Sequence, residues 1–224
     1  MSSRRIAVAE PFMLAVLVLL SSAAISACSS DAKRQRNISE SEKASLREVN
    51  GDTLVSKGDP SASFVFNKSF QYSGRQFIDI MDVAGAEQYF FIDAAADHSI
   101  RRFYWIQFEH YYADNNNIYD YSRIKQQPVS IGRLGFMGDI RLRKNYFTMD
   151  DRPGSDSKAA ENFLRGKGFT LDGSFITLRL FHLPDETKRR ELMIIYGELF
   201  TGDVAEEQMK TEITAHAQEN ITVR

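Results

Sequence analysis

The chain has 224 residues, a mass of 25.5 kDa and a formal net charge of −2 at pH 7. Hydrophobic residues make up 43% and charged residues 26%, which is close to globular averages and excludes a wholly disordered chain. The slightly acidic balance excludes a strongly basic nucleic-acid-binding surface over the whole chain. The single cysteine excludes an intrachain disulfide and a cysteine-rich metal site.

Residues 1–27 have the layout of a secretory signal peptide. Arg4 and Arg5 give a positive start, and an uncharged apolar stretch runs from Phe12 to Ile25. A stretch of about 14 residues is shorter than the roughly 20 that a transmembrane helix needs. We therefore expect this segment to direct export and to be removed.

The peptide Ile-Ser-Ala-Cys follows at residues 25–28 and contains the only cysteine. It resembles the lipobox of bacterial lipoproteins, in which an aliphatic residue, a small residue and Ala or Gly precede the cysteine. The resemblance covers residues 1–28 and implies that Cys28 is acylated, becomes the N-terminus and holds the protein at a bilayer. In the family's sorting rule Ser29 implies an outer-membrane location facing the periplasm, if the cell has two membranes. The alternative is an ordinary signal peptide that leaves Cys28 unmodified.

Residues 29–62 are poor in large apolar side chains and rich in Ser, Lys, Arg, Glu and Asp. This composition favours an extended, flexible segment. We expect residues 28–62 to be the lipidated cysteine and a flexible tether, and residues 63–224 to form one globular domain.

From residue 62 onward, apolar residues alternate with polar ones between turn signals, a pattern that predicts β-strands. The connections between the first four strands are short and favour antiparallel hairpins. The expected strands are Ser63–Tyr72, Gln76–Met81, Gln88–Ala94, Ile100–Tyr112, Phe175–Leu183 and Glu191–Leu199.

Two helices are expected in the second half of the chain. The first is capped at Ser155 and ends near Gly166. The second begins at Asp203, with Glu206 completing a capping box. Residues 121–153, which contain several glycines and prolines, are expected to be a long irregular excursion with short strands.

These elements predict an α+β fold. We expect a single domain with one bent antiparallel sheet of about six strands and two helices on a face or at an end. A barrel-like or helix-grip shape is an option, and residues 221–223 are expected to add a short final strand.

Aromatic residues concentrate in the fourth expected strand and just after it. On a strand, Tyr104 and Phe108 point to one face, and Trp105 and Tyr111 to the other. A strand with one wet face would not carry aromatic residues on both sides, so we expect both faces to be covered. One interpretation is packing alone. The other is a pocket or groove for an apolar or ring-bearing ligand, lined by these four residues.

The sequence predicts no catalytic, metal or cofactor site. The four histidines have no metal-ligand spacing, and neither a GxSxG elbow nor a phosphate-binding glycine loop is present. Residues 114–120 superficially resemble a calcium loop but lack its glycine and its terminal glutamate. A serine triad can be assembled from distant residues, so hydrolysis stays open.

We therefore expect a membrane-anchored envelope lipoprotein that acts as a binding or assembly module for an apolar ligand or an envelope protein partner, without a nucleic-acid partner. The alternatives are an envelope hydrolase with dispersed site residues and a purely structural envelope lipoprotein. Basic residues at 133–144 and 188–190 predict either a solvated surface or contact with anionic headgroups or polysaccharide.

Overall fold

The computed structural model describes residues 45–123, 126–148, 150, 152–203 and 205–224. Cys28, the signal peptide and the beginning of the expected tether lie outside these residues. The described part consists mostly of antiparallel strands with two helices, which confirms the α+β class.

Two antiparallel sheets replace the single sheet that the sequence predicts. The smaller sheet contains, in spatial order, β1 (Arg47–Asn50), β2 (Thr53–Ser56), β3 (Ala62–Phe66) and β11 (Ile221–Val223). The larger sheet contains β4 (Gln71–Ile80), β5 (Ala84–Ala94), β6 (Ile100–Tyr111), β10 (Arg190–Phe200), β9 (Ser174–His182), β8 (Leu134–Arg143) and β7 (Gln127–Ile131). Neither sheet closes into a barrel within the described residues, so the barrel-like option is wrong.

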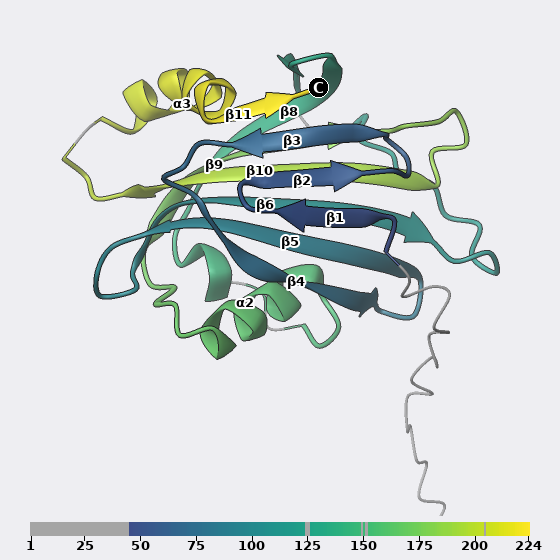
Figure 1. Ribbon diagram of the computed structural model, residues 1–224, viewed down its shortest axis with the longest axis horizontal. Coiled ribbons are helices and arrows are strands. Elements are labelled where there is room, and N and C mark those ends of the chain that lie inside the picture. The colour runs from purple at the N-terminus through teal and green to yellow at the C-terminus, as the bar shows by residue number, and fades with distance from the viewer. Residues whose placement is uncertain (1–44, 124–125, 149, 151, 204) are drawn as a thin grey trace, which may run out of the picture. The chain divides into compact units, whose positions relative to one another are not determined.

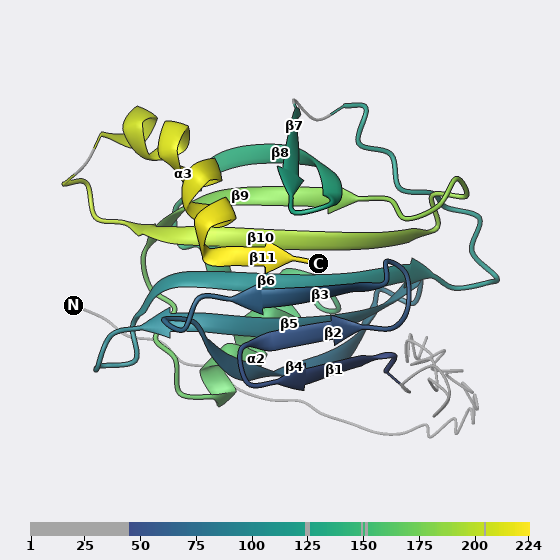
Figure 2. The ribbon, with the colours of Figure 1, turned by 45° about the horizontal axis from the view of Figure 1, so that its top comes forward.

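The larger sheet is covered on both faces (Figures 1 and 2). The smaller sheet and helix α3 (Glu206–Asn220) cover one face, and helix α2 (Asp156–Gly166) with the 3-10 turn η1 (Tyr146–Thr148) lies against the other. Neither helix of the described part has the length and apolar character to cross a bilayer. The covered faces explain why the long central strands carry apolar side chains on both sides.

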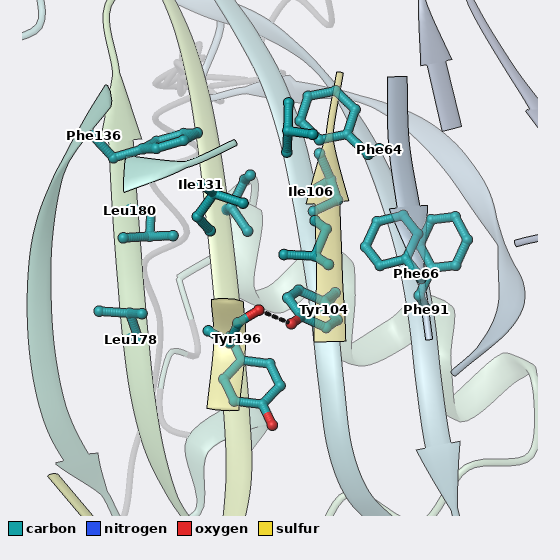
Figure 3. Close-up of a cluster of buried hydrophobic side chains, with 14 of the residues drawn as sticks. Phe64, Phe66, Phe91, Tyr104, Ile106, Ile131, Phe136, Leu178, Leu180 and Tyr196 are labelled. Atoms are coloured by element: carbon teal, nitrogen blue, oxygen red, sulfur yellow. Dashed lines mark hydrogen bonds between the residues drawn. The ribbon is translucent and has the colours of Figure 1, made fainter. Parts of the chain in front are cut away.

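The first core lies between the two sheets (Figure 3). Phe64 and Phe66 of β3 meet Phe91 of β5 and Tyr104 of β6, and the rings of Phe66 and Phe91 stack with centroids 3.8 Å apart. The buried Tyr104 hydroxyl donates a hydrogen bond of 2.7 Å to the carbonyl of Ala217 in α3. This bond joins the helix to the central strand. It also gives the buried hydroxyl a partner, without which its burial would cost free energy.

The second core lies on the opposite face of the larger sheet. Phe103 and Trp105 of β6 and Phe175 of β9 pack there against Phe147 of η1 and Leu164 of α2. Strand β10 contributes a glycine at this point: an added Cβ at residue 197 would lie 2.5 Å from the Phe103 Cζ. The missing side chain therefore makes room for the aromatic ring.

The tether prediction is wrong for the described residues before 63. Strands β1 and β2 occupy part of that segment and pair with β3. Their inner face is partly built by Arg47, whose guanidinium lies 4.1 Å from the Phe108 ring centroid and 2.7 Å from Glu87. The arginine side chain covers the ring where an apolar residue would otherwise lie. The alternation of apolar and polar residues that predicts a strand is therefore missing at this position.

Two further expectations need correction. Residues 121–153 contain the ten-residue strand β8, in which Gly138 allows close packing because an added Cβ would lie 2.9 Å from Val129. Helix α3 begins at Glu206, after an Ala205 cap without a side-chain hydrogen bond, whereas Asp203 accepts a bond from Thr201. The helix at 156–166 and the strand at 221–223 are confirmed.

Candidate functional site

The four aromatic residues singled out in the sequence do not share a surface. Tyr104 and Phe108 belong to the core between the sheets, whereas Trp105, which is 1% exposed, belongs to the core under α2. Only Tyr111 is half-buried. Both faces of β6 are covered, as expected, and packing accounts for the first three residues. A ligand pocket lined by all four is not formed, because adjacent strand residues point to opposite faces.

Tyr111 instead leads to a group of tyrosines in the segment that follows β6. Its ring stacks on Tyr119 with centroids 4.5 Å apart, and Tyr121 stacks on Phe181 of β9 at 4.3 Å. The backbone N–H of Tyr119 donates to the carbonyl of Lys188 at 2.8 Å. The segment is therefore fixed against the larger sheet by rings and by main chain.

Two glutamates lie directly beneath these tyrosines. Glu109 of β6 and Glu191 of β10 are Cα partners in the strand register, so both side chains project from the same face. Tyr119 donates a hydrogen bond of 2.7 Å to Glu109, and the Tyr121 hydroxyl donates to Glu191. Glu191 is only 5% exposed. The structure thus brings two acids and two phenols together from three segments that are distant in the sequence.

Burial changes the protonation of this acid pair. Burial, together with the neighbouring charge of Glu109, raises the pKa of Glu191 to about 8, while the bond from Tyr121 opposes the shift. Burial also raises the pKa of Glu109, against the bonds from Tyr119 and Gln107. Since two adjacent buried carboxylates repel each other, the pair retains a proton at neutral pH.

A row of glutamines connects the acid pair to helix α2. Gln76 donates to Gln88 at 2.7 Å, Gln88 to Gln107 at 2.9 Å, and Gln107 to Glu109 at 2.7 Å. The first two also donate to main-chain carbonyls of α2, at Ala159 and Asp156. Each amide has its partner, so the row holds the acid pair in one orientation.

Beside the tyrosines lies an open groove of about 560 Å³, which we call the tyrosine groove. Its walls include the two stacked rings of Tyr121 and Phe181, together with Tyr119, Phe136 and Met137. Met137 is 40% exposed. His182 and Lys188 are among the polar residues of the groove. The hydroxyls of Tyr119 and Tyr121 are already bonded to the acid pair, so these residues present mainly their rings to the groove. The groove therefore offers aromatic and apolar surface with a few polar groups.

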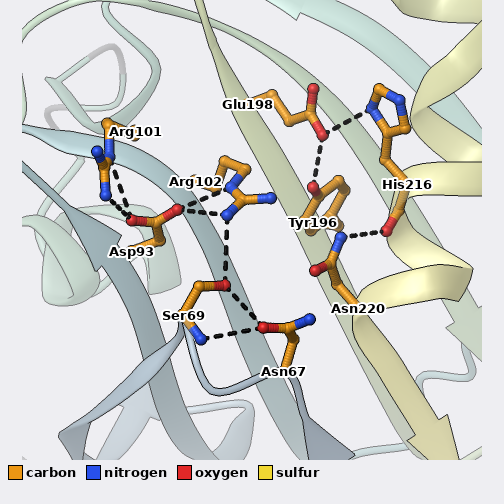
Figure 4. Close-up of polar contacts among 9 residues, drawn as sticks. All are labelled: Asn67, Ser69, Asp93, Arg101, Arg102, Tyr196, Glu198, His216 and Asn220. Carbon is orange, nitrogen blue, oxygen red and sulfur yellow. Dashed lines mark hydrogen bonds and ion pairs between the residues drawn. The ribbon is translucent and has the colours of Figure 1, made fainter.

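The histidines make separate contacts in different parts of the fold. No group of three metal-binding side chains occurs among the described residues. His182 bonds to the carbonyl of Gly135 at 2.8 Å. At another part of the fold His216 and Tyr196 both contact Glu198 (Figure 4). This grouping of a histidine, a carboxylate and a hydroxyl was not predicted. The contact of His216 with Glu198 joins α3 to β10, and burial raises the pKa of the Tyr196 phenol.

Cys28 lies outside the described residues, so its acylation stays a prediction. Comparison of the chain with protein-family models, curated proteins and solved structures found no match.

Proposed function

We propose that this chain is a lipid-anchored envelope protein whose globular part binds an apolar or ring-bearing ligand in the tyrosine groove. The anchor would be acylated Cys28, which places the protein at a bilayer, in the outer membrane facing the periplasm if the cell has two membranes. Two or three acyl chains bind a membrane firmly, because each buried methylene contributes about 0.8 kcal/mol.

The observation that carries the binding proposal is the preorganised aromatic wall of the groove. Tyr121 is stacked on Phe181 and bonded to Glu191, and Tyr119 is stacked on Tyr111 and bonded to Glu109. A ligand therefore meets rings that are already ordered, and binding costs little side-chain entropy. Large, stiff rings of this kind suit apolar and ring-bearing ligands.

The groove can be tested with the neutral dye N-phenyl-1-naphthylamine and the Met137→Asp variant. Met137 is exposed, so an aspartate is tolerated there, but its charge makes the groove unsuitable for an apolar ring. We expect saturable dye fluorescence with the natural protein and at least about tenfold weaker binding by the variant. The matched control is Met81→Asp, a methionine of similar exposure at 43% that does not line the groove. Equal loss in both variants, or no dye binding, would refute the proposal.

The anchor can be tested separately by labelling cells with a radioactive or clickable fatty acid. The natural chain should incorporate the label and Cys28→Ser should not, because Cys28 is the only thiol. Unchanged labelling of the variant would contradict the anchor. Mass spectrometry of the detergent-extracted protein would show whether the groove carries a lipid or whether a protein partner is retained.

A further inference from the structure

A second groove, of about 650 Å³, shares no residue with the tyrosine groove. It lies where β4 begins, β5 ends and β6 begins, next to the end of α2. Three cationic side chains line it, Lys68, Arg101 and Lys167, and Asp93 is its only acid. We call it the basic groove.

The single acid of the basic groove is already neutralised (Figure 4). Arg101 pairs with one oxygen of Asp93, and Arg102 pairs with the other through Nε at 2.8 Å and Nη2 at 2.6 Å. The Asp93 side chain is only 5% exposed. Arg102 also donates to the hydroxyl of Ser69 at 3.3 Å, and Asn67 accepts a bond from the same hydroxyl. Two guanidinium groups for one carboxylate leave positive charge at the wall of the groove.

The two lysines add charge that no acid offsets. Lys68 and Lys167 are exposed, and neither has an ion pair with any residue of the described part of the chain. Lys167 lies 5.5 Å from the ring centroid of Phe163. The chain as a whole is slightly acidic, so this local excess of cations is not a general property of its surface.

The local backbone is built to bring Lys167 to this groove. Gly74 has a φ of +127° at an irregular point in the pairing of β4 with β5. An added Cβ there would lie 2.9 Å from the Phe163 ring and 3.6 Å from the Lys167 Nζ. A glycine at this position therefore allows the last turn of α2 to approach β4 closely.

We propose that the basic groove binds a phosphate group. A phosphate monoester carries about −1.5 to −2 charges and three acceptor oxygens, which match several cations better than one carboxylate would. Lysines bind phosphate as point charges, and the remaining N–H groups of Arg101 can donate to its oxygens. The hydroxyls of Ser69 and Ser73 and the half-exposed ring of Tyr72 line the same groove and would contact the group that bears the phosphate. The phosphate belongs either to a soluble molecule or to a lipid headgroup.

The test uses the full chain with Cys28→Ser, so that an acyl anchor does not carry it to vesicles, and two probes, glycerol 3-phosphate by calorimetry and phosphatidylglycerol vesicles by flotation. The variant Lys68→Gln with Lys167→Gln removes two charges without breaking any described hydrogen bond. The matched control, Lys57→Gln with Lys144→Gln, removes the same charge from exposed lysines that line neither groove. We expect at least about tenfold weaker binding by the groove variant and little change in the control. Binding should also weaken as salt is raised.

The outcomes separate the sources of the phosphate. Groove-dependent binding of the soluble phosphate supports a free ligand, and groove-dependent binding of vesicles alone supports a headgroup. Absence of binding to both probes, or equal weakening by the groove and control variants, would overturn the proposal. The dye experiment on the tyrosine groove is independent of either result, because the two grooves have no residue in common.

Discussion

Replacing the buried Glu191 by glutamine should stabilise the protein at neutral pH. Glutamine has nearly the same shape, and its carbonyl oxygen can still accept the hydrogen bond from Tyr121. It cannot ionise, so folding no longer requires Glu191 to take up a proton in order to avoid a second negative charge beside Glu109 in a buried site.

The sign and size of the effect follow from the shift in pKa. Burial raises the pKa of Glu191 from 4.5 to about 8, so the folded protein holds this proton more tightly than the unfolded chain does. The resulting stability is fully present below pH 4.5 and is lost as the pH rises towards 8. At pH 7 the loss amounts to roughly 3 kcal/mol, at 1.36 kcal/mol per pH unit. We therefore expect the two proteins to be similar at pH 4 and the variant to be more stable by about that amount at pH 7.

Urea unfolding between pH 4 and pH 8.5 measures this difference. Trp105 is the only tryptophan and is buried in the core, so its fluorescence reports loss of the fold. The control is Glu219→Gln, an exposed glutamate on α3, which should leave the pH dependence unchanged. A Glu191→Gln protein that is less stable at pH 7, or whose advantage does not grow with pH, would refute the reasoning.

Two further substitutions test the packing around the acid pair and the second core. Gly197→Ala should lower the free energy of unfolding by about 1–3 kcal/mol, because its methyl group would overlap the Phe103 ring. Thermal unfolding measures this loss. The control is Gly135→Ala, whose methyl group would enter open space and should have little effect. Tyr121→Phe removes the donor to the buried acid beneath it and should destabilise the protein by about 1–3 kcal/mol, more at pH 9 than at pH 5, because the lost bond is stronger to the ionised acid. Tyr72→Phe, at a 37% exposed ring, is the control, and equal effects of the two tyrosine variants would contradict this role.

The sequence predicted those elements whose side chains follow a simple hydrophobic period. Strands β6, β9 and β10 and helix α2 were found nearly at their observed bounds, because they are covered by ordinary apolar residues. Strand β1 was missed because Arg47 covers the Phe108 ring in place of an apolar side chain. Strand β8 was missed because it contains two glycines, which usually indicate turns, and one of them, Gly138, here allows close packing.

The candidate site was harder to predict than the fold, because it depends on register between distant strands. The aromatic concentration that contains Tyr119 and Tyr121 was visible in the sequence, but the stacking of Tyr121 on Phe181 was not. The pairing of Glu109 with Glu191 depends on the alignment of β6 with β10, and a shift by one residue would place one of the acids on the opposite face.

The acid pair also links the fold to the proposed binding site. A buried pair of acids costs stability, and replacing it by neutral groups would make the protein more stable. Glu109 and Glu191 nevertheless hold the hydroxyls of Tyr119 and Tyr121, and these are the residues whose rings form part of the wall of the tyrosine groove. If the acids served packing alone, Glu191→Gln would gain stability and leave dye binding intact. If they orient the wall through their charge, the same variant would bind the dye more weakly above pH 8, where Glu191 of the natural protein is ionised, although the variant is more stable. Measuring both quantities on one protein therefore separates a structural role of the acid pair from a role in positioning the groove.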